Sequence, residues 1–150
     1  SDVCSSDLWG PMLTPWAEWR QGALVRRAAA GDPAALADVA RRTSLEREVD
    51  WVSGACLAVR RDAAVAAGLI DERYFMYEED VDFCAALRAR GGHVLFTPAA
   101  TITHLRGRAM STAPRRHPSH YDESHLAFYR KHAPVYVPFL WAWKKLHGRI

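Results

Sequence analysis

Hydrophobic and polar positions follow recognisable patterns from residue 49 onward. The segment DWVSGACLAVR, residues 50–60, is mostly apolar and predicts a buried strand. Gly54 interrupts it, which favours a bulge or a close backbone approach at that point. Further along, HVLFTP at residues 93–98 predicts a strand ended by Pro98, and ATITHL at residues 100–105 predicts a second short strand.

Helices are predicted before and after the first of these strands from capping residues. Asp32 followed by Pro33 is a typical helix start, and the alanine-rich stretch that follows predicts a helix as far as Arg42. Asp62 is a candidate cap for a short helix that ends at Gly68. Both helices are short, so we expect them to depend on packing against the rest of the chain.

Two further helices are predicted from helical spacing. One begins at Glu79 and ends ahead of Gly91, with its apolar side chains on a single face: Val81, Cys84, Ala85 and Leu87. The other, SHYDESHLAFYRKHAP, starts near Ser119 or Asp122 and stops around Pro134. Strands and helices thus occur together, and the fold class predicted is α/β.

The patterns divide the chain into segments of different character. Residues 1–8, SDVCSSDL, look like translated sequencing-adapter sequence and are left out of the fold prediction. The remaining segments are a helical or irregular connection at 9–48, an ordered part at 49–107, a basic loop at 108–119, a C-terminal helix at 120–134 and a candidate membrane-interface segment at 135–150.

Composition narrows the class of protein. The chain has 150 residues, enough for one ordinary domain, with 49% hydrophobic residues and a formal charge of +3. This charge does not form the concentrated basic stripe of a nucleic-acid binder, so no nucleic-acid partner is predicted. Three cysteines without a CxxC pair favour a reduced, cytoplasmic setting, and no apolar run has the length of a membrane-spanning helix.

The last sixteen residues, VYVPFLWAWKKLHGRI, combine aromatic residues with cations. Tryptophan followed by lysine suits the interface of a membrane, where apolar rings and charged heads both find a favourable environment. A terminal helix packed on the body of the domain accounts for the same pattern. The sequence leaves both interpretations open.

An acidic cluster is the clearest chemical feature of the chain. In YFMYEEDVDFC, residues 74–84, an apolar run leads directly into Glu78, Glu79, Asp80 and Asp82. Acids in the first turn of a helix stabilise it by about 0.3–1 kcal/mol each and need no function. However, the apolar run also predicts a partly dry pocket, where a carboxylate has a raised pKa and can act as a general base.

Three ordered motifs give the chain a family resemblance. Together they resemble the C-terminal half of a family-2 glycosyltransferase domain, an inverting GT-A type, and most of all the rhamnosyltransferase-like group that extends bacterial cell-surface polysaccharides. The motifs are DWVSGACLAVRRDA, GLIDERYFMYEEDVDFCAALRARG and HVLFTPAATITH. The resemblance covers residues 49–107, and YDESHLAFYRKHAP resembles the helix that follows. It implies the acceptor-side part of a nucleotide-diphospho-sugar transferase domain, with a mixed sheet and flanking helices.

The resemblance assigns roles to three residues of this sequence. Asp80, the second acid of the Glu-Asp pair, matches the catalytic base that takes the proton from the acceptor hydroxyl. Glu79 matches the acid that positions the acceptor or the base. His104, at the end of a predicted strand, matches a histidine that binds metal in some family members.

The resemblance also marks a substrate-binding region. Gly54 and Ala55 match the turn that lines the sugar pocket, and Asp50 and Trp51 stand where the family has residues near the acceptor. Trp51 fits stacking on a sugar face or a place in the core. Arg106 and the arginines that follow it fit contact with a pyrophosphate or an acidic glycan, and equally a solvated loop.

A single displacement with inversion follows from the resemblance. The donor is a nucleotide sugar, and the acceptor is a glycan or a lipid-linked sugar at the cytoplasmic face of the inner membrane. A divalent cation, Mg²⁺ or Mn²⁺, is expected to stabilise the leaving diphosphate. No Asp-x-Asp motif precedes residue 49. We therefore expect a fragment that is inactive alone, with the cation held mainly by the nucleotide-binding half.

The sequence also offers candidates for other functions. His117 and His120 have HxxH spacing, but without further ligands at suitable spacing a zinc site is disfavoured. A glycoside hydrolase needs two acids about 5–10 Å apart on either side of a bond, which adjacent acids do not provide. A non-catalytic membrane-associated module, built from the basic loop and the Trp/Lys-rich tail, is the main alternative. Cys56 and Cys84 are expected to pack as small hydrophobic residues.

Overall fold

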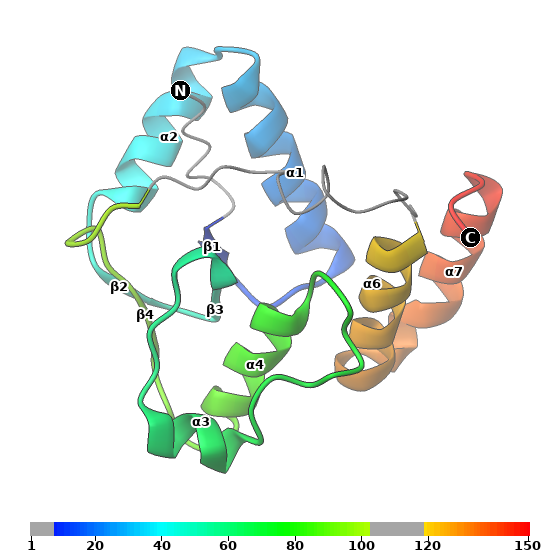
Figure 1. The fold of residues 1–150 in the computed structure, drawn as a ribbon. Helices are drawn as coiled ribbons and strands as arrows, with labels where there is room; N and C mark the ends of the chain where they lie inside the picture. Colours follow the sequence, from blue (N-terminus) through cyan, green and yellow to red (C-terminus); the bar gives the residue numbers. More distant parts are fainter. Residues whose placement is uncertain (1–7, 103–118) are drawn as a thin grey trace.

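The structure is a computed structural model that describes residues 8–102 and 119–150 (Figure 1). Helices predominate in this part of the chain, and the strands are short. The helices are α1 (Pro15–Ala29), α2 (Pro33–Thr43), α3 (Arg61–Ala67), α4 (Glu79–Arg88), α6 (Ser119–His132) and α7 (Val137–Leu146). The strands are β1 (Trp9–Gly10), β2 (Arg47–Val49), β3 (Trp51–Val52) and β4 (Val94–Phe96), and two 3-10 turns occur at Gly54–Cys56 and Pro134–Tyr136.

The strands form two small antiparallel sheets. β1 pairs with β3, and β2 pairs with β4 in a register that sets Val49 opposite Val94. The extended stretch of residues 47–52 is divided between these sheets because its first half pairs with β4 and its second half with β1. The strand predicted over residues 50–60 is therefore wrong beyond Val52, where the chain turns at Gly54. The α/β class holds, but a mixed sheet does not occur in the described residues.

Local capping signals placed most helix ends correctly. The side chain of Asp32 accepts hydrogen bonds from the backbone N–H groups of Ala34 and Ala35, at 2.9 and 3.1 Å, and starts α2 as predicted. Gly68 ends α3 with a left-handed φ of 92°. Asp62 does not cap this helix. It lies within the first turn and pairs with Arg60 instead.

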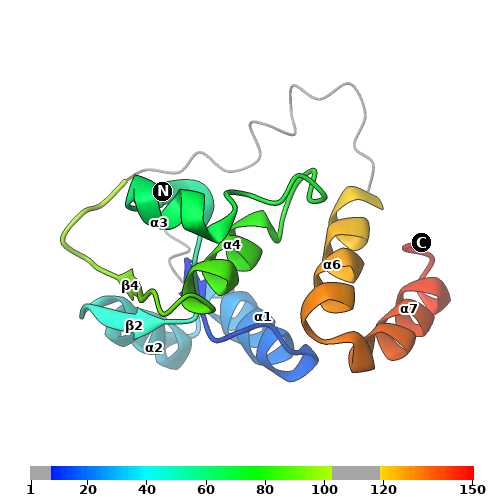
Figure 2. The same cartoon turned by 90° about the horizontal axis from the view of Figure 1, so that it is seen from below.

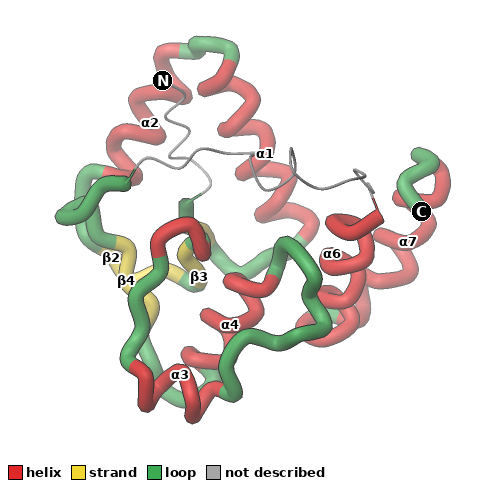
Figure 3. The backbone as a smooth tube through the Cα atoms, viewed as in Figure 1, coloured by secondary structure: helices red, strands yellow, loops and turns green. Residues whose placement is uncertain are grey.

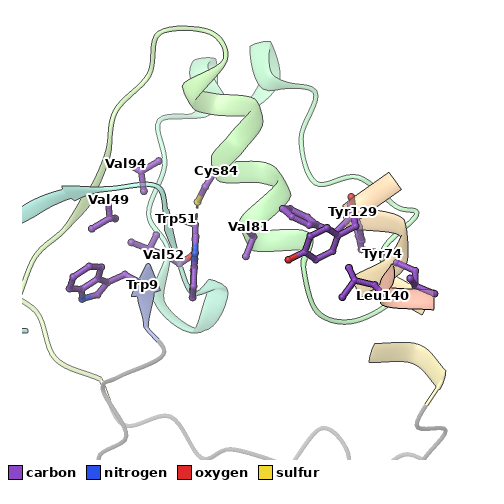
Figure 4. Close-up of a cluster of buried hydrophobic side chains, with 12 residues drawn as sticks. Trp9, Val49, Trp51, Val52, Tyr74, Val81, Cys84, Val94, Tyr129 and Leu140 are labelled. Carbon is purple, nitrogen blue, oxygen red and sulfur yellow. Dashed lines mark hydrogen bonds between the residues drawn. The ribbon is translucent and has the colours of Figure 1, made fainter. Parts of the chain in front are cut away.

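The hydrophobic core lies around α4 (Figure 4). Val81 stands between one group of buried side chains from the sheets, including Trp51 and Val52, and a second group that includes Tyr129 of α6 and Leu140 of α7. Cys84 is fully buried in this core, as predicted, whereas Cys56 is exposed because the turn at Gly54 carries it to the surface.

α4 holds the central place among the helices (Figure 2). It contacts β3, β4 and α3, while α6 and α7 lie against each other. A long loop joins α3 to α4, and strand is confined to a small patch of the chain (Figure 3). The first turn of α4, which carries the predicted catalytic acids, is thus set between the sheets and the C-terminal pair of helices.

Candidate active site

The two residues that precede α4 have an unusual backbone conformation. Tyr77 and Glu78 have φ angles of 72° and 69°, in the left-handed region that residues with a side chain rarely adopt. Each such residue costs on the order of 1–3 kcal/mol and persists only where its surroundings hold it. Glu78 is the N-cap of α4, and no side-chain hydrogen bond caps this helix. The position of the first turn therefore depends on tertiary contacts.

The carboxylate of Asp80 lies beside Gly54. The backbone N–H of Gly54 donates a hydrogen bond to Oδ2 of Asp80 at 2.7 Å, and the N–H of Val81 donates to Oδ1 at 2.8 Å. Asp80 is partly exposed, and Gly54 is exposed. The structure thus brings together two residues that lie 26 positions apart and that the sequence placed in one site. The contact orients the carboxylate at the protein surface, where its remaining lone pairs can accept a proton.

Glu79 is the second acid of this pair and is partly buried. Burial raises the pKa of its carboxyl, and the neighbouring charge of Asp80 acts in the same direction. Its buried Oε2 atom has no hydrogen-bond partner among the described residues. The group is consistent with the predicted role of holding a hydroxyl or the base.

Glu78 is the most strongly perturbed acid of the cluster. Its carboxyl is buried, and burial raises its pKa to about 8. The charges of Glu18, Asp80 and Glu79 contribute to this rise in pKa, while the charge of Lys144 acts in the opposite direction. Part of the cluster is therefore protonated near neutral pH, which lowers the repulsion among the three adjacent acids.

We expect Glu78→Gln to remove a pH dependence of stability. The folded-state pKa is about 8 and the unfolded one about 4.5, so the contribution of Glu78 is complete below pH 4.5 and is lost as the pH rises to 8. At about 1.4 kcal/mol for each pKa unit, the wild type should lose about 2–4 kcal/mol relative to the variant over this range. Urea unfolding at pH 5 and pH 8 measures this difference. Glu72→Gln, at an exposed acid, is the control, and parallel curves for wild type and Glu78→Gln would contradict the expectation.

Asp82 differs from its neighbours because its carboxylate is buried and occupied by contacts inside the protein. It is 2% exposed and accepts a hydrogen bond from the hydroxyl of Tyr74 at 3.2 Å. On its other side it contacts Nζ of Lys131 at 2.8 Å and Nε2 of His132 at 2.5 Å. This carboxylate links α4 to α6 and is not available to a substrate or a metal ion.

The predicted acceptor-side residues are held by internal contacts. Asp50 accepts a hydrogen bond from the N–H of Met12 at 2.7 Å and forms an ion pair with Arg88 at 2.6 Å. Trp51 is buried, and its indole N–H donates to the carbonyl of Pro11 at 2.9 Å. The core alternative for Trp51 is therefore the correct one, and stacking on a sugar face is not, because its ring is covered.

The turn predicted to line the sugar pocket has its amides occupied. The N–H of Gly54 binds Asp80, and the N–H of Ala55 binds Oγ of Ser53 at 3.3 Å. A Cβ atom added at Gly54 would lie 3.5 Å from that of Asp80, an ordinary contact. The idea that a missing side chain admits substrate to these amides is thus not supported, because the N–H of Gly54 holds the carboxylate of Asp80 instead.

His104, Arg106 and the HxxH pair member His117 lie outside the described residues, as does the basic loop up to residue 118. Within residues 8–102 and 119–150, no group of three His, Cys, Asp or Glu side chains could hold a metal ion. The described part of the chain does not fit the expected divalent cation, since Asp82 is committed to Lys131 and His132. Binding of a divalent cation therefore stays a prediction that concerns residues outside the described part of the chain.

Glu18 of α1 has contacts that the sequence did not reveal. Its carboxylate lies 2.9 Å from Nε2 of His125 and accepts a hydrogen bond from the hydroxyl of Tyr129 at 2.9 Å. Both partners belong to α6, more than a hundred positions away. Polar residues at i and i+4 on the buried face of α6 were the only sequence signal of this link.

Asp122 of α6 is the second unpredicted link. It is fully buried, and its carboxylate pairs with the buried ammonium of Lys144 of α7 and with Arg149 at 3.2 Å. The C-terminal helix is thus fixed to the body of the protein by an internal ion pair.

Comparison with known proteins places these features in a family. The family model described as glycosyltransferase like family 2 matches residues 34–122, which include Gly54 and the acids of α4. No solved structure matches the chain.

Curated relatives point in the same direction. The chain is 36% identical over 98 residues to N-acetylglucosaminyl-diphospho-decaprenol L-rhamnosyltransferase from two strains of Mycobacterium tuberculosis, a match that covers 64% of this chain and 32% of the relative. It is 38% identical over 56 residues to rhamnosyltransferase WbbL of Escherichia coli (strain K12), covering 37% and 21%. The chain therefore spans about a third or less of the length of these relatives.

Proposed function

Because the chain belongs to glycosyltransferase like family 2, we propose that it is the acceptor-side part of a GT-A type enzyme that transfers a sugar from a nucleotide-sugar donor with inversion. The observation that supports this most is the contact of Asp80 with Gly54. It orients a partly exposed carboxylate at the start of a helix, inside the region that the family model matches.

In the proposed reaction, Asp80 acts as the general base. It takes the proton of the acceptor hydroxyl while that oxygen forms a bond to the anomeric carbon of the donor sugar. The bond from this carbon to the diphosphate breaks on the opposite face, and the nucleoside diphosphate leaves with the electron pair. Glu79, beside the base and with a free buried oxygen, holds the acceptor or the base in place.

The relatives narrow the proposed substrates. The names of these relatives specify rhamnose for both and a decaprenol-linked sugar for the mycobacterial protein. We extend these to the present chain: a nucleoside-diphosphate rhamnose as donor and a polyprenyl-linked sugar as acceptor, at the cytoplasmic face of the membrane. A Mg²⁺ or Mn²⁺ ion would neutralise the leaving diphosphate when bound.

A hybrid protein tests this function. The segment of the mycobacterial relative that matches this chain is replaced by the corresponding residues of this chain, and transfer of radiolabelled rhamnose to N-acetylglucosaminyl-diphospho-decaprenol is measured. The proposal predicts product formation by the hybrid. A folded hybrid that binds the nucleotide sugar but forms no product, while the unmodified relative does, would contradict it.

The C-terminal helix favours membrane association as a second candidate function. Leu140 and Lys144 of α7 are buried, whereas Phe139, Trp143 and Leu146 form an exposed apolar stripe on another face. Residues 135–150 contain no acid, and the cations Lys145 and Arg149 lie in the same segment as this stripe. An apolar stripe bordered by cations complements an anionic lipid surface. Among the described residues, no helix combines the length and the apolar character of a membrane span. The membrane contact that we propose for α7 is peripheral.

We expect the chain to bind vesicles through this stripe. Phe139→Ser combined with Leu146→Ser should lower co-sedimentation with phosphatidylglycerol vesicles by about tenfold or more, since each buried apolar side chain contributes about 1.5–3 kcal/mol. The control carries Leu36→Ser and Val65→Ser, which are exposed apolar residues on other helices. Equal binding by both variants, or self-association through the stripe without lipid binding, would contradict this candidate function.

A further inference from the structure

We propose that Lys131 and His132 of α6 are positioning residues for the base Asp80, acting through Asp82. This inference rests on the proposed function for its catalytic meaning, but the physical link can be measured without any reaction. Asp80 and Asp82 belong to the same first turn of α4, so whatever fixes the position of one also fixes the other.

The first turn of α4 has little local support. Two left-handed residues precede it, and no side chain caps it. It is held instead from two directions. On one side Gly54 donates to Asp80, and on the other Lys131 and His132 contact the buried carboxylate of Asp82. Removal of the second support leaves the turn free to shift, because the hydrogen bond to Gly54 is partly exposed to water.

Lys131 also connects the turn to the segment in front of it. Its ammonium lies 2.9 Å from Asp71 and 2.8 Å from Asp82, so a single cation bridges the loop after α3 and the start of α4. Tyr74, on the same loop, donates to Asp82. The loop that carries the strained residues Tyr77 and Glu78 is thereby tied to α6 at the point where α4 begins.

The bridge between Lys131 and Asp82 depends on the positive charge of Lys131. The buried carboxylate of Asp82 requires a cation or several hydrogen bonds, because an isolated buried charge is costly. Lys131 supplies the cation, and its side chain is one third exposed, so it can be replaced without opening the core. Arg130, the preceding residue, is exposed and pairs with no acid among the described residues, which makes it a matched control with the same charge.

Hydrogen exchange at the N–H of Gly54 reports directly on the position of Asp80, since this N–H donates to that carboxylate. We expect Lys131→Met in the ¹⁵N-labelled chain to raise the exchange rate at Gly54 about tenfold more than the rates at core amides of α6, which change only as far as overall stability falls. Lys131→Arg should restore the wild-type rate, and Arg130→Met should leave it unchanged. His132→Gln, which keeps a hydrogen bond to Asp82 without an imidazole, should produce a smaller increase than Lys131→Met.

In a hybrid enzyme whose replaced segment extends through α6 of this chain, Lys131→Met should lower kcat while KM for the nucleotide sugar stays unchanged. An unaltered Gly54 exchange rate in Lys131→Met would overturn the inference, and so would an equal increase at all core amides, which indicates loss of stability alone. If Gly54 exchange responds as expected but Asp80→Asn leaves sugar transfer intact, the link from Lys131 to the first turn of α4 stands, and the assignment of Asp80 as the general base fails. If Asp80→Asn abolishes transfer while Lys131→Met changes neither the Gly54 exchange rate nor kcat, the role of Asp80 stands and the positioning role of Lys131 fails.

Discussion

Asp80→Asn should lower kcat for sugar transfer in the hybrid enzyme by about 10²–10⁴-fold, the contribution typical of a general base. Asparagine has the shape of aspartate, and its amide oxygen can still accept the hydrogen bond from Gly54, while the weaker local bond from the N–H of Val81 is lost because the amide NH2 group only donates. It lacks the basicity to take a proton from the acceptor. The turn should therefore keep its structure while the chemical step is lost, and KM for the donor should change little.

The control for this prediction is Asp62→Asn. Asp62 is an exposed acid of α3 that pairs with Arg60, so its loss should leave the rate within about twofold of wild type, in keeping with the small contribution of surface ion pairs. Circular dichroism of Asp80→Asn should match the wild type. A folded Asp80→Asn enzyme with undiminished kcat would remove Asp80 from the reaction.

Lys144→Met should lower the free energy of unfolding of the chain by about 3 kcal/mol. The side chain of Lys144 is 2% exposed, and its ammonium pairs with the fully buried carboxylate of Asp122. Methionine fills a similar volume but leaves that carboxylate without its main cation, and breaking a buried pair typically costs about 3–5 kcal/mol. Arg149, which also contacts Asp122, should keep the loss near the lower end of this range.

Urea unfolding measures this loss, and two further variants test its cause. Lys145→Met removes the exposed neighbouring lysine and should change stability by less than about 0.5 kcal/mol. Combining Lys144→Met with Asp122→Leu removes both charges, so most of the lost stability should return. A double variant as unstable as Lys144→Met would show that packing, and not the unpaired charge, causes the effect.

Much of the helical fold could be predicted because its signals are local. Asp32 before Pro33, Gly68 at a helix end and the acids that begin α4 act within one or two turns, and each lies where the sequence placed it. The sheets could not be predicted in the same way, because residues 47–52 contact two different partners far away in the chain. The apolar run over residues 50–60 gave no sign of that division.

The candidate site, like the sheets, could be predicted only in part. The acidic cluster was visible in the sequence, but the different roles of its members were not. Asp82 is buried because Lys131 and His132 come from a helix fifty residues away, and Glu78 is perturbed in part by Glu18 of α1. Trp51 was compatible with a sugar-binding and a core position, and the burial of its ring, with its hydrogen bond to Pro11, decided between them.

A structure of the hybrid enzyme with a non-transferable donor analogue and the acceptor would test the central claim most directly. The account predicts the reacting hydroxyl of the acceptor within about 2.6–3.2 Å of a carboxylate oxygen of Asp80, with Gly54 still donating to the same carboxylate. An acceptor hydroxyl bound by another acid, with Asp80 turned away from it, would contradict the account.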